Sequence, residues 1–379
     1  MLGGSINNTN FAAVRLLSNG ELDPNFGGND GQNPGTVYIP TFGVYPCNQC
    51  FALALQPTDG KIILGGIIGA VTPNYIAAVR LTSEGALDTT FGNQTPTDGT
   101  MSLTQTITNG SGIDDQCRSV ALQNDGKILL GGFSAAGNTD GGSDYYFAIV
   151  RLLASGELDP TFGGQNSLPG TFYLTPTISG GTGDQCYSIA VQSDGKIVMG
   201  GFTANSAFSG GVANNPYFAA ARLLTNGTVD TTFGGINGQN PGSMYITPRI
   251  TGGNGEQCNS IILQSDEKII MAGTTAYNPT GGAPLLSFAL TRLLKNGQLD
   301  ASFGGTISQS GTTYLTSAII PAAYNSIGST VMILPNNKIV VGGLFFGNGL
   351  FFGLAQFINP MTLADYQTSY AGIGAGLYV

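Results

Sequence analysis

The charged residues of this chain recur at fixed intervals. Arginine occupies positions 15, 80, 151, 222 and 292, with spacings of 65, 71, 71 and 70 residues, and an aspartate follows each arginine eight residues later. A guanidinium forms two parallel hydrogen bonds with a carboxylate. The arginines could therefore bind an anionic ligand, or each could pair with its own aspartate within the fold. A ligand site usually breaks the symmetry of a repeat, and we therefore favour structural ion pairs. They are Arg15–Asp23, Arg80–Asp88, Arg151–Asp159, Arg222–Asp230 and Arg292–Asp300.

A second polar set precedes the cysteines of the repeat. Its acids and the amides beside them are Asp115, Asp184, Glu256, Gln116, Gln185 and Gln257. Carboxylate and amide oxygens suit a hard cation such as calcium or a polar ligand, and they would surround one mouth of a channel if the following strand lined it. Hydrogen bonding within loops is the alternative, since no Asp-x-Asp-x-Asp loop occurs. We predict binding residues here, but no resident metal and no cofactor.

Four of the five cysteines share one repeat position: Cys50, Cys117, Cys186 and Cys258. Zinc needs four ligands at one point, and a disulfide needs Cα atoms within about 7 Å. The repeat separates these cysteines, so we predict buried thiols that pack as small apolar side chains. Cys47 and Cys50 form the one close pair, which is a weak metal signal, and whether they are bonded stays open.

The composition narrows the function classes. Charged residues make up 9% of the chain and the net charge is −9, which disfavours binding to nucleic acid. No apolar run of about 18 residues occurs, so no membrane-spanning helix is expected. The chain has no histidine and no tryptophan, which removes the usual general base and the largest sugar-stacking side chain. On that ground we predict that the protein is not an enzyme.

The elements that position these residues are short strands. Apolar residues alternate with period two, and Asp-Gly pairs such as Asp194-Gly195 are a strong hairpin signal. The run Phe-Ala-x-x-Arg-Leu provides a third strand, and segments such as residues 171–176 provide an outer fourth strand. Four antiparallel strands that repeat around an axis describe a β-propeller.

The repeated sequence Ala-Leu-Gln-x-Asp-Gly-Lys-Ile-x-x-Gly-Gly, followed by Phe-Ala-x-x-Arg-Leu-x-x-x-Gly-x-Leu-Asp-x-x-Phe-Gly, resembles the delta-60 repeat family. The resemblance covers essentially the whole chain. It implies a β-propeller-like fold of large secreted or surface proteins, without shared catalytic residues. We predict one domain over residues 1–379, with about six repeats of roughly 65–71 residues and six four-stranded blades. Residues 375–379 are predicted to complete the first blade and close the ring; a seven-bladed or open assembly is the alternative.

Two functions remain open at this point. The first is a non-enzymatic module, extracellular or at the cell surface, that binds a protein or a glycan through its loops. The second is a polysaccharide-acting enzyme, a hydrolase or lyase, with a carboxylate pair at the channel mouth. We favour the first, because the variable loops 133–146, 202–217 and 274–287 suit recognition on a rigid scaffold. These loops contain or adjoin Tyr145, Tyr146, Tyr217 and Tyr277.

Location and partners follow from the same composition. Sparse charge and abundant Asn, Thr and Gly favour an extracellular or surface protein. A cytoplasmic location is the alternative, because unpaired cysteines are stable in a reducing compartment. Besides binding a protein or glycan partner, the protein could self-assemble or form part of a longer chain with further domains.

Overall fold

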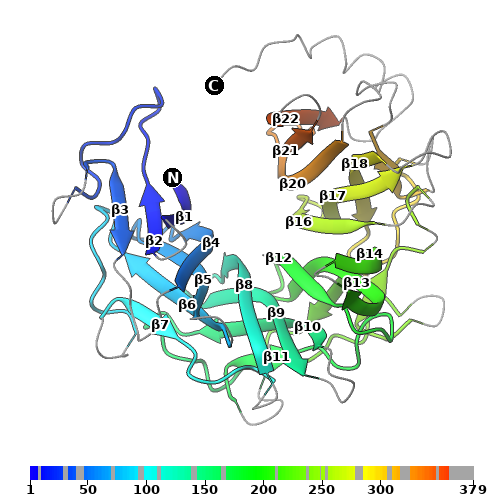
Figure 1. Cartoon of the computed structure of the whole chain (residues 1–379), viewed down its shortest axis with the longest axis horizontal. Helices are drawn as coiled ribbons and strands as arrows, with labels where there is room; N and C mark the ends of the chain where they lie inside the picture. Colours follow the sequence, from blue (N-terminus) through cyan, green and yellow to red (C-terminus); the bar gives the residue numbers. More distant parts are fainter. Residues whose placement is uncertain are drawn as a thin grey trace. The chain divides into compact units, whose positions relative to one another are not determined.

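The computed structural model consists of strands, turns and connecting segments wherever it describes the chain (Figure 1). No helix that could cross a membrane occurs in this described part. The all-β prediction is confirmed. The described residues are 1–6, 10–28, 33–39, 47–69, 73–92, 98–108, 112–137, 143–163, 168–209, 212–235, 239–247, 249–251, 255–277, 285–304, 310–315, 325–346 and 350–357.

The chain forms two compact units. The first unit holds residues 1–175 and 225–228, and the second holds residues 176–224 and 229–379. The single domain over residues 1–379 stays a prediction.

The first unit contains three antiparallel sheets, of three, four and four strands, whose strands pair in chain order. The strands of the first sheet are β1 (Leu2–Ile6), β2 (Asn10–Val14) and β3 (Thr36–Ile39). Those of the second are β4 (Cys47–Leu55), β5 (Ile62–Gly69), β6 (Tyr75–Leu81) and β7 (Thr100–Ser102). Those of the third are β8 (Gly112–Leu122), β9 (Ile128–Gly137), β10 (Ser143–Leu152) and β11 (Thr171–Tyr173).

The second unit contains three further antiparallel sheets. The strands of the fourth sheet are β12 (Gln185–Val191), β13 (Ile197–Ser209), β14 (Val212–Leu223) and β15 (Ser243–Tyr245). Those of the fifth are β16 (Gln257–Leu263), β17 (Ile269–Tyr277), β18 (Leu285–Leu293) and β19 (Thr312–Tyr314). Those of the sixth are β20 (Asn325–Ile333), β21 (Ile339–Phe346) and β22 (Leu350–Phe357). Four of the six predicted four-stranded antiparallel sheets are confirmed, and the first and sixth sheets have three strands each among the described residues. The predicted closing strand, residues 375–379, lies outside the described residues, so closure stays a prediction.

The hairpin turns explain why strands form where they do. Gly60, Gly126 and Gly195 of the Asp-Gly turns have φ values of 72°, 84° and 82°, which an L side chain adopts only with strain. Where glycine is lost, Glu267 and Asn337 still adopt φ values of 66° and 62°. The turn geometry therefore persists after its favoured residue has been replaced.

Neighbouring sheets are joined by one repeated contact. The first such contact lies between the first and second sheets, where the Arg15 guanidinium reaches the carbonyl of Ser83 and the Gly27 N–H donates to the carbonyl of Glu84 over 2.8 Å. Gly85 of that turn packs so closely that a Cβ would lie 2.9 Å from the Phe26 ring. The repeat arginine thus binds its own aspartate and the turn of the next repeat. Sequence reasoning expected only the first of these bonds.

The core lies between the sheets. Between the first and second sheets, Phe11, Phe26 and Val37 pack against Leu64 and Val79, all buried. The fifth and sixth sheets pack in the same manner. The second sheet therefore buries two faces, one against the first sheet and one against the third, and the fifth sheet does the same between the fourth and the sixth.

Candidate functional site

The three predicted acids lie inside the protein. Asp115, Asp184 and Glu256 are each 0% exposed. Asp184 accepts hydrogen bonds from the Ile178 N–H at 2.7 Å and from the Thr203 hydroxyl at 2.5 Å. Each acid ties the loop before its strand to the neighbouring strand through such a pair of donors. The acids therefore line no solvent-accessible mouth in this structure.

The other two acids repeat this arrangement. Asp115 accepts from Ile107 N–H at 2.8 Å and from the Ser134 hydroxyl at 2.5 Å. Glu256 accepts from Ile250 N–H at 2.5 Å, and the Thr275 hydroxyl lies 3.4 Å from the same oxygen. Burial raises the pKa of Asp115, Asp184 and Glu256 to about 7 in each case. We interpret all three as loop clamps.

Asn48 occupies the same position in the second sheet, and its clamp is incomplete. It is 0% exposed, and neither its amide nitrogen nor its carbonyl oxygen has a hydrogen-bond partner among the described residues. The residue opposite it is Ile68, where the third, fourth and fifth sheets have a hydroxyl. A buried polar group without a partner costs about 1–3 kcal/mol.

We therefore expect Asn48→Leu to stabilise the fold by about 1–2 kcal/mol, because the substitution removes the unsatisfied amide and keeps a similar volume. Chemical denaturation would measure the change, with Asp184→Leu as the opposite control, since that substitution orphans two donors. A loss of stability in the Asn48 variant would mean that the amide has a partner in solution.

The remaining predicted residues are spread over several sheets. Tyr146 packs on Tyr173 with ring centroids 5.4 Å apart, and Tyr217 packs on Tyr245 at the same distance. Gln185 accepts a hydrogen bond from the hydroxyl of Tyr187. Gln257 lies half-buried in β16, and the side chain of Tyr277 lies outside the described part of β17.

One feature of the inner strands was not predicted. Each of the strands β4, β8, β12, β16 and β20 has a β-bulge, which inserts one residue opposite the partner strand. A bulge redirects the extra side chain. The extra residue differs in every sheet: Phe51, Arg118, Tyr187, Asn259 and Ser329.

In the first unit two of these bulges meet. The Arg118 guanidinium lies over the Phe51 ring at 4.2 Å and over the Phe133 ring at 5.7 Å from the centroids. Tyr145 extends this row, with its ring 5.8 Å from that of Phe133. Phe51 remains 37% exposed. The result is an aromatic and cationic surface that reaches solvent.

Polar groups complete the surface. Gln116 accepts a hydrogen bond from Arg118 and donates to Asp114 at 2.7 Å. Asn74 donates to the other oxygen of Asp114, also at 2.7 Å. Burial and the nearby Asp114 carboxylate raise the pKa of Tyr145. We refer to Phe51, Asn74, Asp114, Gln116, Arg118, Phe133 and Tyr145 together as the Arg118 cluster.

Of the predicted site residues, the cluster contains Gln116 and Tyr145. The sequence did hold a signal for the rest: Arg118 and Arg249 are the two arginines outside the repeat position. Arg249 lies over Tyr217 at 3.9 Å, but it also donates to the carbonyls of Asn215 and Pro216 at 2.9 Å. We therefore assign Arg249 to holding that segment in place.

Burial also determines the chemistry of the thiols. Cys50, Cys117, Cys186 and Cys258 are buried thiols, and burial raises the pKa of Cys50 and Cys258 to about 12. Such thiols are poor nucleophiles and poor metal ligands. No group of three or more His, Cys, Asp or Glu side chains able to hold a metal ion occurs in the described part of the chain.

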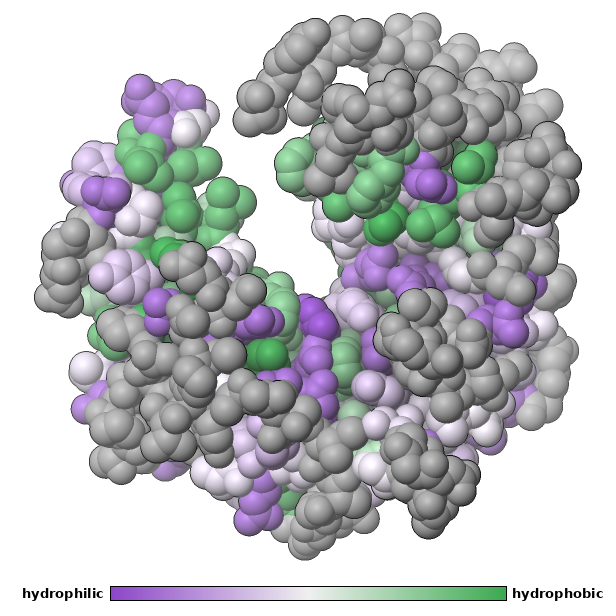
Figure 2. Space-filling model, viewed as in Figure 1, coloured by the Kyte–Doolittle hydropathy of each residue, from purple (hydrophilic) through white to green (hydrophobic). Residues whose placement is uncertain are grey.

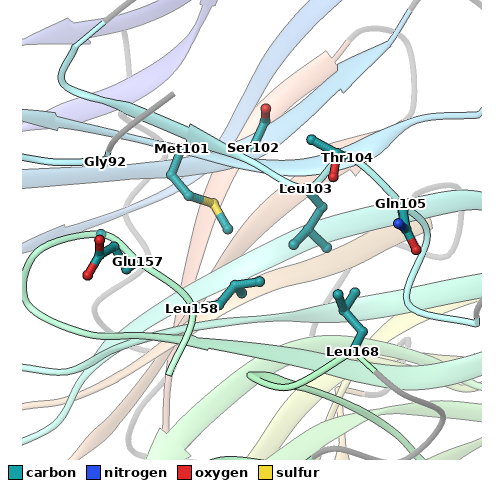
Figure 3. A pocket seen from close by; sticks show the side chains of 10 residues that line it. Gly92, Met101, Ser102, Leu103, Thr104, Gln105, Glu157, Leu158 and Leu168 are labelled. Atoms are coloured by element: carbon teal, nitrogen blue, oxygen red, sulfur yellow. The ribbon is translucent and has the colours of Figure 1, made fainter. Parts of the chain in front are cut away.

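A separate cavity of about 240 Å³ lies beside β7 in the first unit. Figure 3 shows Met101, Leu103, Leu158 and Leu168 pointing into it, with Glu157 to one side. Its lining combines four apolar side chains with Ser102, Thr104 and Gln105 and one carboxylate. It therefore offers neither an aromatic stacking surface nor a pair of acids, and we do not place the site there.

A family model described as a domain of unknown function (DUF5122) β-propeller matches five segments of the chain. They are residues 1–26, 58–91, 123–162, 192–233 and 264–303. The five segments coincide with the repeats, so a β-propeller repeat is supported, while the delta-60 family itself is not named by the match. No curated protein matches the chain.

Solved structures resemble the chain only in fold. A protein of unknown function from Dyadobacter fermentans is 11% identical, with 84% of this chain and 79% of that chain covered and a TM-score of 0.43. A mannose phosphorylase from Leishmania mexicana is 12% identical, with 84% of each chain covered and a TM-score of 0.35. A thermostable family-43 glycoside hydrolase is 12% identical, with 82% and 90% covered and a TM-score of 0.34.

The prediction that the protein is not an enzyme is wrong. It rested on the lack of histidine and tryptophan, which removes only the chemistry that depends on those two side chains. Glycoside hydrolysis runs on carboxyl groups and needs no histidine. The lack of histidine and tryptophan therefore does not exclude enzymes as a class.

Proposed function

We propose that the protein acts on a carbohydrate, which binds at the Arg118 cluster. The observation that supports this is the meeting of two β-bulges, which places Arg118 on the half-exposed Phe51 ring beside a carboxylate and two amides. A ligand site typically combines an apolar aromatic platform with a few convergent polar groups. Sugars present both an apolar ring face and hydroxyl groups, so they match this combination.

The position of the cluster supports the proposal in a second way. The bulge position holds a residue of different chemistry in every inner strand, whereas the apolar positions that follow it change mainly among aliphatic side chains. Variation on a rigid scaffold allows recognition without disturbing the core. A purely structural position would be expected to repeat, as the arginine–aspartate pairs do.

Binding is tested by screening the protein against a panel of polysaccharides and following the best ligand by calorimetry. Phe51→Ala should weaken binding about tenfold, since a well-placed aromatic contact contributes roughly 0.5–1.5 kcal/mol beyond its buried area. Leu55→Ala is the matched control, because Leu55 lies on the same strand, is 55% exposed and is not part of the cluster. Equal losses in both variants, or no bound glycan at all, would contradict the proposal.

Cleavage of the bound glycan is the action that we propose. Asp114 favours it, because this carboxylate lies in the cluster beside Tyr145, whereas Asp115 points into the core. Glycoside hydrolysis uses two carboxyl groups, of which Asp114 would supply one. Release of reducing ends that is lost in Asp114→Asn while binding persists would establish cleavage. Equal turnover in the variant would exclude Asp114 from it.

We further propose that this activity takes place outside the cell or at its surface, where polysaccharides are available as substrates. The low charge content of 9% supports that location. Cell fractionation with an antibody to the protein would test it, and a purely cytoplasmic signal would overturn it.

A further inference from the structure

The cavity of about 240 Å³ beside β7 has two apolar walls and a carboxylate at one end. Met101 and Leu103, each 4% exposed, form one wall, and the half-buried Leu158 and Leu168 form the other. Figure 3 shows the two walls facing one another, with Glu157 to one side. An aliphatic protein cavity of about 150 Å³ already admits a molecule of the size of benzene. The cavity is therefore large enough for a small organic ligand.

Leu168 departs from the repeat. It lies two residues before Gly170, whose carbonyl accepts a hydrogen bond from the Arg151 N–H at 2.8 Å. The other repeats have a polar residue at this position: Asn33, Thr97, Asn240 and Gln309. A binding site usually breaks the symmetry of a repeat, and the wall of the cavity does so at this leucine.

Asn240 shows what the polar residue contributes in another repeat. Within the second unit, its side-chain amide donates to the carbonyl of Thr177 over 3.1 Å. This hydrogen bond ties the loop of one repeat to the segment that follows the outer strand of the preceding repeat. The counterpart of Thr177 beside the cavity is Thr106, and Leu168 has no group that could donate to it. The cavity thus lies where the repeat lacks a polar bridge.

The charge of the lining selects the kind of ligand. Among the ten residues that line the cavity, Glu157 carries the single charge, and none is basic. The chain as a whole has a net charge of −9, so its field adds to the preference for a cation. Over β8 and β9 of the same unit, hydrophilic and hydrophobic side chains are interspersed (Figure 2), whereas four apolar side chains converge in the cavity. These features match a cationic group attached to a short apolar chain.

We propose that the cavity binds a small primary aliphatic amine. The alkyl chain lies between the two apolar walls, and the ammonium group lies at the Glu157 carboxylate. Burial of each methylene group strengthens binding about fourfold until the cavity is filled. The cavity shares no residue with the Arg118 cluster, so this is a second site with a ligand of different chemistry.

The test is calorimetric titration of the full chain with hexylamine at low salt, over about 0.1–10 mM, a range that suits a ligand of few atoms. Hexylamine should bind about fivefold or more tightly than hexanoate, because the carboxylate of hexanoate is repelled by Glu157. Butylamine should bind about tenfold more weakly than hexylamine, since it buries two methylene groups fewer. In a protein labelled at the methionine methyl groups, the NMR signal of Met101, identified by its loss in Met101→Leu, should shift on binding.

Two substitutions locate the ligand. Leu168→Asn restores the residue of the first and fourth repeats and should weaken hexylamine binding about tenfold or more, because it replaces an apolar wall by an amide. Glu157→Gln should weaken it about threefold, as expected for an exposed ion pair. Glu21→Gln is the matched control, because Glu21 holds the same position in the first repeat and does not line the cavity. It should leave binding unchanged.

Three results would overturn the proposal. They are the absence of hexylamine binding over the whole range, equal affinities for hexylamine and hexanoate, and a folded Leu168→Asn protein that binds hexylamine as the wild type does. If Leu168→Asn fails to fold, the exposed Glu157 decides: equal affinities in Glu157→Gln and Glu21→Gln, with an unshifted Met101 signal, would place the amine elsewhere.

Discussion

Replacing Arg151 with methionine is expected to destabilise the protein by about 3–5 kcal/mol, because it leaves a buried carboxylate without its partner. Arg151 is 5% exposed and Asp159 is 1% exposed, and the Arg151 Nε lies 2.9 Å from the carboxylate. The guanidinium also donates to Thr161 at 3.3 Å and to the carbonyl of Thr225. Thermal and urea unfolding would measure the loss.

The matched control is Arg15→Met. Arg15 and Asp23 form the same pair at 2.7 Å, but their side chains are 26% and 13% exposed. Solvent screens this pair, so the loss should be smaller, on the order of 1 kcal/mol. Equal effects of the two substitutions would show that burial does not set the strength of the pairs. A stable Arg151 variant that fails to bind its ligand would restore the ligand-site interpretation.

Stability is expected to be greatest in mild acid, near pH 4. Burial raises the pKa of Asp115, Asp184 and Glu256 to about 7, from 3.8 for the aspartates and 4.5 for the glutamate. The folded state therefore holds more protons than the unfolded state between roughly pH 4 and 7. Stability falls as the pH rises through that window, by a few kcal/mol for each of the three acids.

On the acidic side of this optimum, stability changes with pH in the opposite direction. Hydrogen bonds from threonine or serine and from lysine, with the adjacent arginine, lower the pKa of Asp88, Asp230 and Asp300, the last to about 2, against the effect of burial. The stability that they contribute is present above about pH 4 and is lost as the pH falls. Unfolding temperatures from pH 2 to 9 would trace both flanks.

Asp184→Asn tests whether ionisation of Asp184 contributes to the loss of stability at higher pH. The amide cannot ionise, so the decline from pH 5 to 8 should be shallower in the variant than in the wild type, even if the variant is less stable overall. An unchanged slope would mean that Asp184 does not titrate in this range.

The sequence contained most of the fold. Period-two alternation and the Asp-Gly turns located the strands of each repeat, because both signals are local. Period-two alternation predicts inner strands over residues 51–56 and 118–123, whereas β4 begins at Cys47 and β8 at Gly112. A β-bulge directly after the cysteine interrupts the alternation of apolar residues, and the strand continues on the N-terminal side of the bulge. Alternation alone therefore misses the start of the strand.

Less of the candidate site could be predicted from the sequence. The polarity of Asp115, Asp184 and Glu256 suggested a solvent-facing mouth, but loop N–H groups and hydroxyls from a neighbouring strand enclose them. The hydroxyl donors lie on another strand, and a backbone N–H donor has no signature in the sequence. Arg118 could have been identified as a departure from the repeat, yet its contact with Phe51 depends on how two sheets pack.

The central claim, that a glycan binds at the Arg118 cluster, is tested most directly with a matched pair of glutamines. Gln116 and Gln257 hold the same repeat position in different sheets, and only Gln116 belongs to the cluster. Calorimetric titration of the best glycan ligand should show about tenfold weaker binding for Gln116→Leu, since a hydrogen bond to a charged group contributes roughly 1.5–3 kcal/mol, and unchanged binding for Gln257→Leu. Equal affinities in the two variants, with both folded, would contradict the account.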